Sequence, residues 1–192
     1  MKELRRLNPI EAKLTLIKLL QSAHAGEKAA ANAYYGHAQS LFVKSEKEKK
    51  EILDIYKDEL HHRKRLGEML IELKASPKPL KEFLMYTVGF VIGFLCLFGG
   101  WFIPMYGAGK LESENVEEYE VAARLALLAG FSHLIDEFLV FAEVEWDHEL
   151  YFRRKAQSHR LSQTFSLWKK PKARESIRKN FETFQNHSYS YK

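Results

Sequence analysis

Two copies of the pattern Glu-x-x-His could bind metal ions. They are Glu59-Leu-His-His62 and Glu145-Trp-Asp-His148. Residues three apart on a helix project to the same side, so both side chains of one motif can reach the same ion. A single motif of this kind arises by chance on helix surfaces, and the interest of these two depends on what accompanies them.

Two further glutamates precede the motifs at almost equal distances. Glu27 lies 32 residues before Glu59, and Glu112 lies 33 residues before Glu145. A turn is expected about halfway between the members of each pair, so two antiparallel helices would hold both glutamates at the same height. One Glu from each of two helices, with Glu-x-x-His from each of two others, is the ligand set of di-iron and di-manganese carboxylate bundles. The predicted metal ligands are Glu27, Glu59, His62, Glu112, Glu145 and His148.

The charge of this set indicates two divalent cations. Four carboxylates supply four negative charges, and a carboxylate in a core costs several kcal/mol unless a cation or proton compensates it. Carboxylate and imidazole ligands suit two iron ions, with manganese as the alternative. Tyr34 and Tyr119, each seven residues after a predicted ligand, are candidate catalytic residues that could donate hydrogen bonds or electrons near the metals. The competing interpretation is a bundle with two chance motifs whose polar core residues are satisfied by hydrogen bonds.

The third helix offers more than one glutamate as a ligand. Glu112 begins the apolar stripe of that helix and is favoured, but a shift of register would recruit a neighbour. The neighbours are Glu114, Glu117, Glu118 and Glu120. Four other histidines lie beside or off the ligand stripes, where a surface or supporting role is expected. They are His24, His37, His61 and His133.

The elements that must position these residues are helices. Strand signals are nearly absent, and apolar residues recur at helical spacing, which predicts an all-α, ferritin-like four-helix bundle with an additional apolar helix. The capping box of Ser45 and Glu48 opens the second bundle helix, and Ser76-Pro77-Lys78-Pro79 follows it as a break. The expected bundle helices are 9–42, 45–74, one ending near Ala129, and one from about Ser132 past Phe152. The predicted domain organisation is a di-metal bundle over residues 1–158 and a basic polar tail over 159–192, with a short helix near 173–184.

The segment Phe83–Gly109 contains no charged residue. It is long enough to cross a bilayer, but Pro104 and several glycines interrupt it. It could also lie along a membrane interface, or serve as a buried crossover between the second and third bundle helices. Interfacial contact is the favoured interpretation.

Composition and charge restrict the class of protein. The 192 residues are 46% hydrophobic and 29% charged, with a net charge of +5. Residues 151–192 hold 11 Lys or Arg against 2 Glu, a net +9, which suggests either solvation or docking on anionic lipid; a nucleic-acid partner is not expected. A single cysteine, Cys96, excludes an intramolecular disulfide and a thiolate metal cage. The N-terminus has no apolar core of the signal-peptide type, which predicts a cytoplasmic protein.

With these residues in place, the chain resembles the demethoxyubiquinone hydroxylase family over residues 14–152. The resemblance is carried by His24-Ala-Gly-Glu27 with Tyr34, by Lys57-Asp-Glu59-Leu-His-His62, and by the run from Gly89 through Gly100 to Glu112. It implies a membrane-associated di-iron monooxygenase of ubiquinone biosynthesis with a quinone substrate. The match at the third-helix glutamate also supports Glu112 as a ligand.

The sequence departs from the family pattern in three places. Glu149-Leu-Tyr151-Phe152 replaces an acid- and histidine-rich continuation, Ser113 replaces a second acidic residue, and the basic tail replaces an apolar final helix. The leading hypothesis is an oxygenase bound peripherally to the inner face of the membrane, by the apolar segment and by the tail, with Arg153 and Arg154 near the head groups. Because there is no glycine-rich nucleotide motif, electrons must come from a partner or the substrate. The alternatives are a rubrerythrin- or ferritin-type ferroxidase or peroxidase and a membrane-attached metal-binding scaffold; a homo-oligomer is compatible with each.

Overall fold

The computed structural model describes residues 4–189, and these residues form helices and no strand. The fold is therefore all-α, as predicted. The main helices are α1 (Pro9–Ala38), α2 (Glu46–Glu72), α3 (Pro79–Cys96), α4 (Phe102–Ala129), α5 (Ile135–Gln157) and α6 (Ser176–Tyr189). Three short 3-10 helices are η1 (Leu4–Arg6), η2 (Ser132–Leu134) and η3 (Arg160–Gln163).

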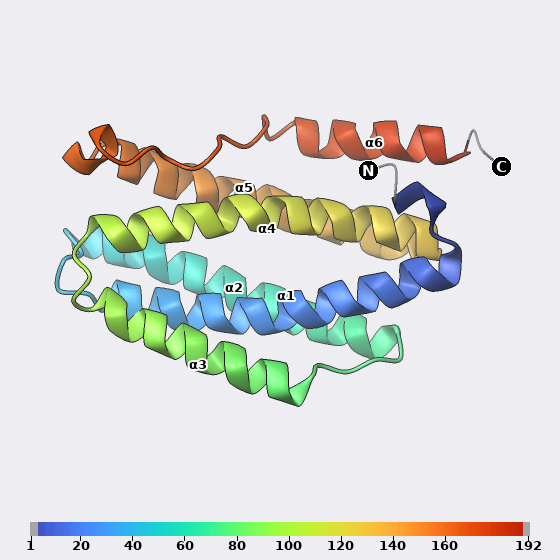
Figure 1. The fold of residues 1–192 in the computed structure, drawn as a ribbon, viewed down its shortest axis with the longest axis horizontal. Coiled ribbons are helices and arrows are strands. Elements are labelled where there is room, and N and C mark those ends of the chain that lie inside the picture. The colour runs from blue at the N-terminus through green and yellow to red at the C-terminus, as the bar shows by residue number, and fades with distance from the viewer. Residues whose placement is uncertain (1–3, 190–192) are drawn as a thin grey trace. The chain divides into compact units, whose positions relative to one another are not determined.

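The chain divides into two compact units. Unit 1 consists of Met1–Leu19 and Ala108–Lys192, and unit 2 consists of Leu20–Gly107. In unit 2, most of α1 lies beside α2 and α3, and in unit 1, most of α4 lies with α5 and α6 (Figure 1). α1 and α4 each continue from one unit into the other, and each unit contains one Glu-x-x-His motif.

Local sequence signals set the starts of the first two helices. The Asn8 side chain accepts hydrogen bonds from the backbone N–H groups of Ile10 and Glu11, both at 3.0 Å, and the Glu11 carboxylate accepts from the Asn8 N–H. The predicted cap of α2 is confirmed, since the Ser45 hydroxyl accepts from the Glu48 N–H at 3.1 Å. α1 ends at Ala38, before the expected Phe42, and a turn leads into α2.

In unit 2, α3 packs against α1 through glycines. A Cβ on Gly93 would lie 2.6 Å from the carbonyl oxygen of Asn32, and a Cβ on Gly89 would clash with the backbone of Ala29. From the α1 side, a Cβ on Gly36 would clash with the backbone of Gly93. The two helices approach so closely because glycine carries no side chain at these points.

Gly93→Ala is expected to lower the free energy of unfolding by about 1–3 kcal/mol, since the added methyl group has to push two backbones apart. Gly107→Ala is the matched control. Its Cβ would meet nothing within 4 Å, so the helix preference of alanine should stabilise α4 by about 0.5–1 kcal/mol. Urea unfolding of the two variants should give changes of opposite sign. An equal stability of Gly93→Ala and the unchanged protein would contradict this packing.

The apolar segment Phe83–Gly109 is not one element. α3 ends at Cys96, and α4 already begins at Phe102. Gly100 lies between them with a φ of +75°, a left-handed conformation that favours glycine. The apolar segment is therefore divided between two helices, and the additional apolar helix expected from the sequence is α3, which follows α2 and precedes α4 in the chain.

In unit 1, α6 packs on α5 by an apolar stripe and by ion pairs. Ile177, Phe181 and Phe184 are all buried, at the i, i+4, i+7 spacing of one helix face. Arg178 binds Glu143 at 2.6 Å and Asp136 at 2.7 Å. The helix lies close to the 173–184 range expected from the sequence.

His37, near the end of α1 in unit 2, is a buried histidine. His37 is 2% exposed, and burial lowers its pKa to about 4, against the opposing influence of the Glu48 carboxylate. That carboxylate is itself buried, and it accepts hydrogen bonds from the Lys44 N–H at 2.8 Å and the Trp101 indole N–H at 2.9 Å. The His37 ring is therefore neutral in the folded protein at neutral pH.

The stability of the protein should fall as the pH drops from about 6.5 toward 4, in part because of His37. In this window the unfolded chain binds a proton at His37 while the folded chain does not, which costs about 2–3 kcal/mol near pH 4.5. His37→Gln cannot titrate, so its loss of stability between pH 7 and pH 4.5 should be smaller by this amount in urea unfolding. His133→Gln, at an exposed site, is the control. Equal pH dependence of the His37 variant and the unchanged protein would contradict the lowered pKa.

Candidate metal centre

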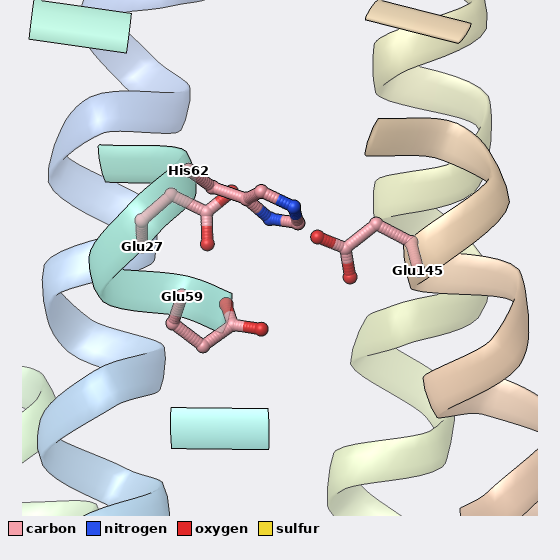
Figure 2. Close-up of side chains that lie close together, drawn as sticks. All are labelled: Glu27, Glu59, His62 and Glu145. Atoms are coloured by element: carbon pink, nitrogen blue, oxygen red, sulfur yellow. The ribbon is translucent and has the colours of Figure 1, made fainter. Parts of the chain in front are cut away.

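Unit 2 brings together three of the predicted ligands. Glu27 on α1 and Glu59 and His62 on α2 are all buried, at 4%, 0% and 2% exposure. Each offers a ligand atom, and these atoms lie within 4.8 Å of one another. Figure 2 shows the two carboxylates and the imidazole extending from neighbouring helices toward one another. We call these three residues half-site 2.

Unit 1 repeats the arrangement with the other three ligands. Glu112 on α4 and Glu145 and His148 on α5 are buried, and their ligand atoms also lie within 4.8 Å of one another. Glu145 and His148 share a helix face, with a carboxylate oxygen 3.9 Å from the ring Nδ1. We call these residues half-site 1. Both half-sites have the same composition, two carboxylates and one imidazole.

Asn115 holds the two carboxylates of half-site 1. Its side-chain amide donates to Glu112 Oε2 at 3.2 Å and is 3.4 Å from Glu145 Oε2. One amide group that donates to carboxylates from both helices fixes their separation. Asn115 was not among the residues expected at the site, although its position three residues after Glu112 places it on the same face of α4.

The donor sets fit a metal ion. Two buried carboxylates within a few Å of each other repel, and in a core this is costly unless a cation lies between them. Carboxylate oxygen and neutral imidazole nitrogen are ligands for iron and manganese, whereas neither half-site contains the thiolate that would favour a zinc or copper cage. Cys96, the single cysteine, is buried on α3, and burial raises its pKa to about 11.

A partly buried ionic network in unit 2 connects α3 to the helices that carry half-site 2. Glu82 at the start of α3 accepts from Arg63 at 2.7 Å and contacts His24 Nδ1 at 2.7 Å, while Arg63 also donates to the His24 carbonyl oxygen at 2.6 Å. Burial lowers the pKa of His24. The pKa of Glu82 is raised by burial but lowered overall by the hydrogen bonds from Arg63 and His24. His24 is one turn before Glu27, so the network fixes α1 and α2 next to their ligands.

The structure answers the question of register on α4. Glu112 is fully buried in half-site 1, whereas Glu114 and Glu117 are exposed and Glu118 is half-buried. Glu120 is buried but pairs with Arg124 at 2.9 Å. The favoured choice of Glu112 therefore agrees with the geometry, while ligation itself stays a prediction.

The remaining candidates are the two tyrosines proposed as catalytic residues and the histidines outside the ligand set. Tyr34 is buried in unit 2, and Tyr119 is buried in unit 1 with its ring edge-on to Phe141, 5.3 Å between centroids. Their catalytic role stays a prediction. His61 and His133 are exposed, as expected for surface residues.

The environment of Arg153 on α5 corrects one expectation about the basic residues. Arg153 is 6% exposed and binds Glu149 at 2.6 Å, so it does not face head groups. Glu149, directly after His148, also accepts from the Trp168 indole N–H at 2.6 Å. Glu149, in the stretch that departs from the family pattern, thus binds the C-terminal segment to α5.

Comparison with known proteins supplies the family. The family model described as Ubiquinone biosynthesis protein COQ7 matches residues 15–120, more than half of the chain. The matched range includes half-site 2 and Glu112, and it ends before Glu145 and His148. Neither a curated protein nor a solved structure matches. The match agrees with an all-α ferritin-like bundle, and the chain belongs to the COQ7 family, the demethoxyubiquinone hydroxylases of ubiquinone biosynthesis.

Proposed function

We propose that this chain is a di-iron oxygenase that hydroxylates a lipid-like quinone at a membrane surface. One observation carries the proposal. A chain of a ubiquinone-biosynthesis family has two buried half-sites with identical donor sets, each made of two carboxylates and one imidazole. The family supports the hydroxylation step, and the donor sets support a redox metal as its cofactor.

The charge of the two half-sites supports two ions. Each half-site contributes two carboxylates, so one divalent cation neutralises it. Half-site 2 would supply Glu27, Glu59 and His62 to the centre, and half-site 1 would supply the other three ligands. Iron, when bound, would supply the redox chemistry that activates dioxygen.

The protein's own residues would position and protect this chemistry. Asn115 would keep the carboxylates of Glu112 and Glu145 in place, so that metal binding requires little rearrangement. The network of Arg63, Glu82 and His24 would do the same for α1 and α2. Buried aromatic residues such as Phe141 and Phe152 would exclude water from the surroundings of half-site 1.

The surface of α3 supports membrane association. Within residues 4–189, α3 is the one helix whose length and apolar composition would suffice to cross a membrane, and only 17% of it is buried. Its buried residues are small, Gly89, Gly93 and Cys96, whereas large apolar side chains face outward. The most exposed of these are Leu80, Phe83, Leu84, Phe90, Phe94 and Leu95. An apolar surface of this kind suits the interface of a bilayer, where a lipid-like quinone would also be found.

Anaerobic loading with ferrous iron followed by O2 and a short-chain demethoxyquinol tests the proposal. We expect about two iron ions per chain and a product that is heavier by one oxygen atom in mass spectrometry. Iron oxidation or peroxide consumption without a hydroxylated product would instead favour a ferroxidase or peroxidase. Metal-dependent stabilisation without O2 consumption would indicate a scaffold, and at most one ion per chain would contradict the dinuclear centre.

A further inference from the structure

A short loop of the C-terminal segment is hydrogen-bonded at both ends to side chains of α5. It comprises residues 168–172, Trp-Lys-Lys-Pro-Lys, and we call it the lysine loop. At its start, Arg153 donates to the carbonyl oxygens of Trp168 at 3.2 Å and Lys169 at 3.1 Å. At its end, the Trp146 indole N–H donates to the Lys172 carbonyl oxygen at 2.7 Å. A loop fixed at both ends presents its side chains in a defined arrangement.

The lysine loop forms one wall of a groove in unit 1. The groove has a volume of about 370 Å3, and residues of α4, α5 and the start of α6 form its other walls. Its apolar lining comes from Trp146, Trp168, Val116 and Ile177. The groove is partly open to solvent, so groups of a bound partner can enter it.

Two sets of basic residues in unit 1 differ in their partners. Arg153, Arg174 and Arg178 are neutralised by carboxylates of α5. The second set, at the groove, is exposed, and among the described residues no carboxylate oxygen lies within 4.0 Å of its ammonium groups. This set consists of Lys110, Lys169, Lys170 and Lys172.

The carboxylates of the groove do not cancel this charge. Glu114 and Glu117 face it from α4, and the Glu120 carboxylate is occupied by Arg124. Four lysines against two free carboxylates leave the groove positive. A positive surface with an apolar floor is complementary to an acidic protein surface, and such complementarity raises association rates and fixes orientation.

The groove lies next to half-site 1. The Trp168 ring packs against Gly109, where a Cβ would clash with it, and Gly109 is three residues before Glu112. The Trp168 indole is hydrogen-bonded to Glu149, and Glu149 directly follows His148. The floor of the groove is therefore connected to His148, a candidate ligand, by the hydrogen bond from Trp168 to Glu149 and by the peptide bond between His148 and Glu149.

We propose that the lysine loop and its groove are the docking surface for an acidic one-electron carrier protein. This inference rests on the proposed function. Hydroxylation consumes O2, two electrons and two protons for each C–H bond converted to C–OH, and it releases one water. The two electrons would come from two successive encounters with the reduced carrier, each of which leaves the carrier oxidised by one electron.

The test uses an acidic [2Fe–2S] ferredoxin as the probe and the triple variant Lys169→Glu, Lys170→Glu, Lys172→Glu. Binding of the oxidised ferredoxin, measured by calorimetry at low salt, should weaken at least 10-fold in this variant. The matched control changes three exposed lysines of α2 in unit 2, Lys47→Glu, Lys50→Glu and Lys64→Glu, and should stay within about 2-fold of the unchanged protein. In the unchanged protein, affinity should fall steeply with salt. Metal content and melting temperature verify that both variants fold.

Two outcomes would overturn the docking surface. One is equal ferredoxin binding by the triple variant and its control. The other is a triple variant that loses binding to anionic vesicles but still binds ferredoxin. That result would assign the loop to a lipid surface. The ferredoxin binding measurement does not depend on turnover. A failure of the iron-loaded protein to hydroxylate quinol with a chemical reductant would therefore count against the proposed function and leave the binding result standing.

Discussion

Glu59→Gln is expected to change the stability of the metal-free and the metal-loaded protein in opposite directions. Glu59 is fully buried, and its carboxylate lies within a few Å of the Glu27 carboxylate. Without metal, removal of one buried negative charge relieves repulsion and desolvation, and the variant should be more stable by about 1–4 kcal/mol. With metal, the variant has lost a charged ligand and should lose most of the stabilisation that the ion provides. That stabilisation is about 4 kcal/mol at metal concentrations 1,000 times Kd.

Melting curves with and without ferrous iron under anaerobic conditions measure both effects. Glu68→Gln is the matched control, because Glu68 is an exposed carboxylate on the same helix that pairs with Arg65. Its substitution should leave the metal-dependent shift in melting temperature unchanged. If Glu59→Gln retained the full shift, Glu59 would not be a ligand. If it destabilised the metal-free protein, its carboxylate would be compensated within the protein by other groups.

Replacement of four outward-facing residues of α3 by serine is expected to reduce partitioning onto lipid vesicles by about 1,000-fold. The residues are Leu80, Phe83, Phe90 and Phe94, which are 55–81% exposed. Each large apolar side chain that enters the interface contributes on the order of 1 kcal/mol, so four contribute about 4 kcal/mol. Since these side chains are mostly solvent-exposed, the variant should unfold at nearly the same urea concentration as the unchanged protein.

Flotation with liposomes measures this partitioning. The control replaces four comparably exposed apolar residues outside α3, namely Ile10, Leu41, Ile71 and Phe165. It should float as well as the unchanged protein. Equal flotation of the α3 variant and this control would show that α3 is not the membrane contact, and the lipid-like substrate would lose its main support.

Periodicity and spacing were sufficient to predict the fold class and the two half-sites. Glu59 and His62 share a helix face by local geometry alone, and Glu27 follows from the position of the turn. The register of Glu112 was favoured by the same apolar stripe that the structure buries. These features depend on short-range helix geometry, because the spacing of residues along the chain determines which side chains share a helix face.

Contacts between distant residues could not be predicted in this way. Glu82 is 58 residues from His24 and Trp168 is 19 residues from Glu149, and neither pair has a spacing that reveals it. The boundary between α3 and α4 was also not predicted, because the apolar segment contains several glycines and its composition does not mark Gly100 as the turn. Charge counting in the tail overlooked partners for a related reason, since Arg174 and Arg178 pair with Asp147 and Glu143 of α5, which only the fold brings close.

The division of the chain into units has a consequence for biosynthesis. Unit 2 is one continuous stretch that ends at Gly107, whereas unit 1 combines Met1–Leu19 with residues from Ala108 onward. During translation, unit 2 can fold once Gly107 has left the ribosome, while the first residues of unit 1 must wait for α5 and α6. The residues of half-site 2 would therefore come together in the nascent chain before those of half-site 1 have all left the ribosome.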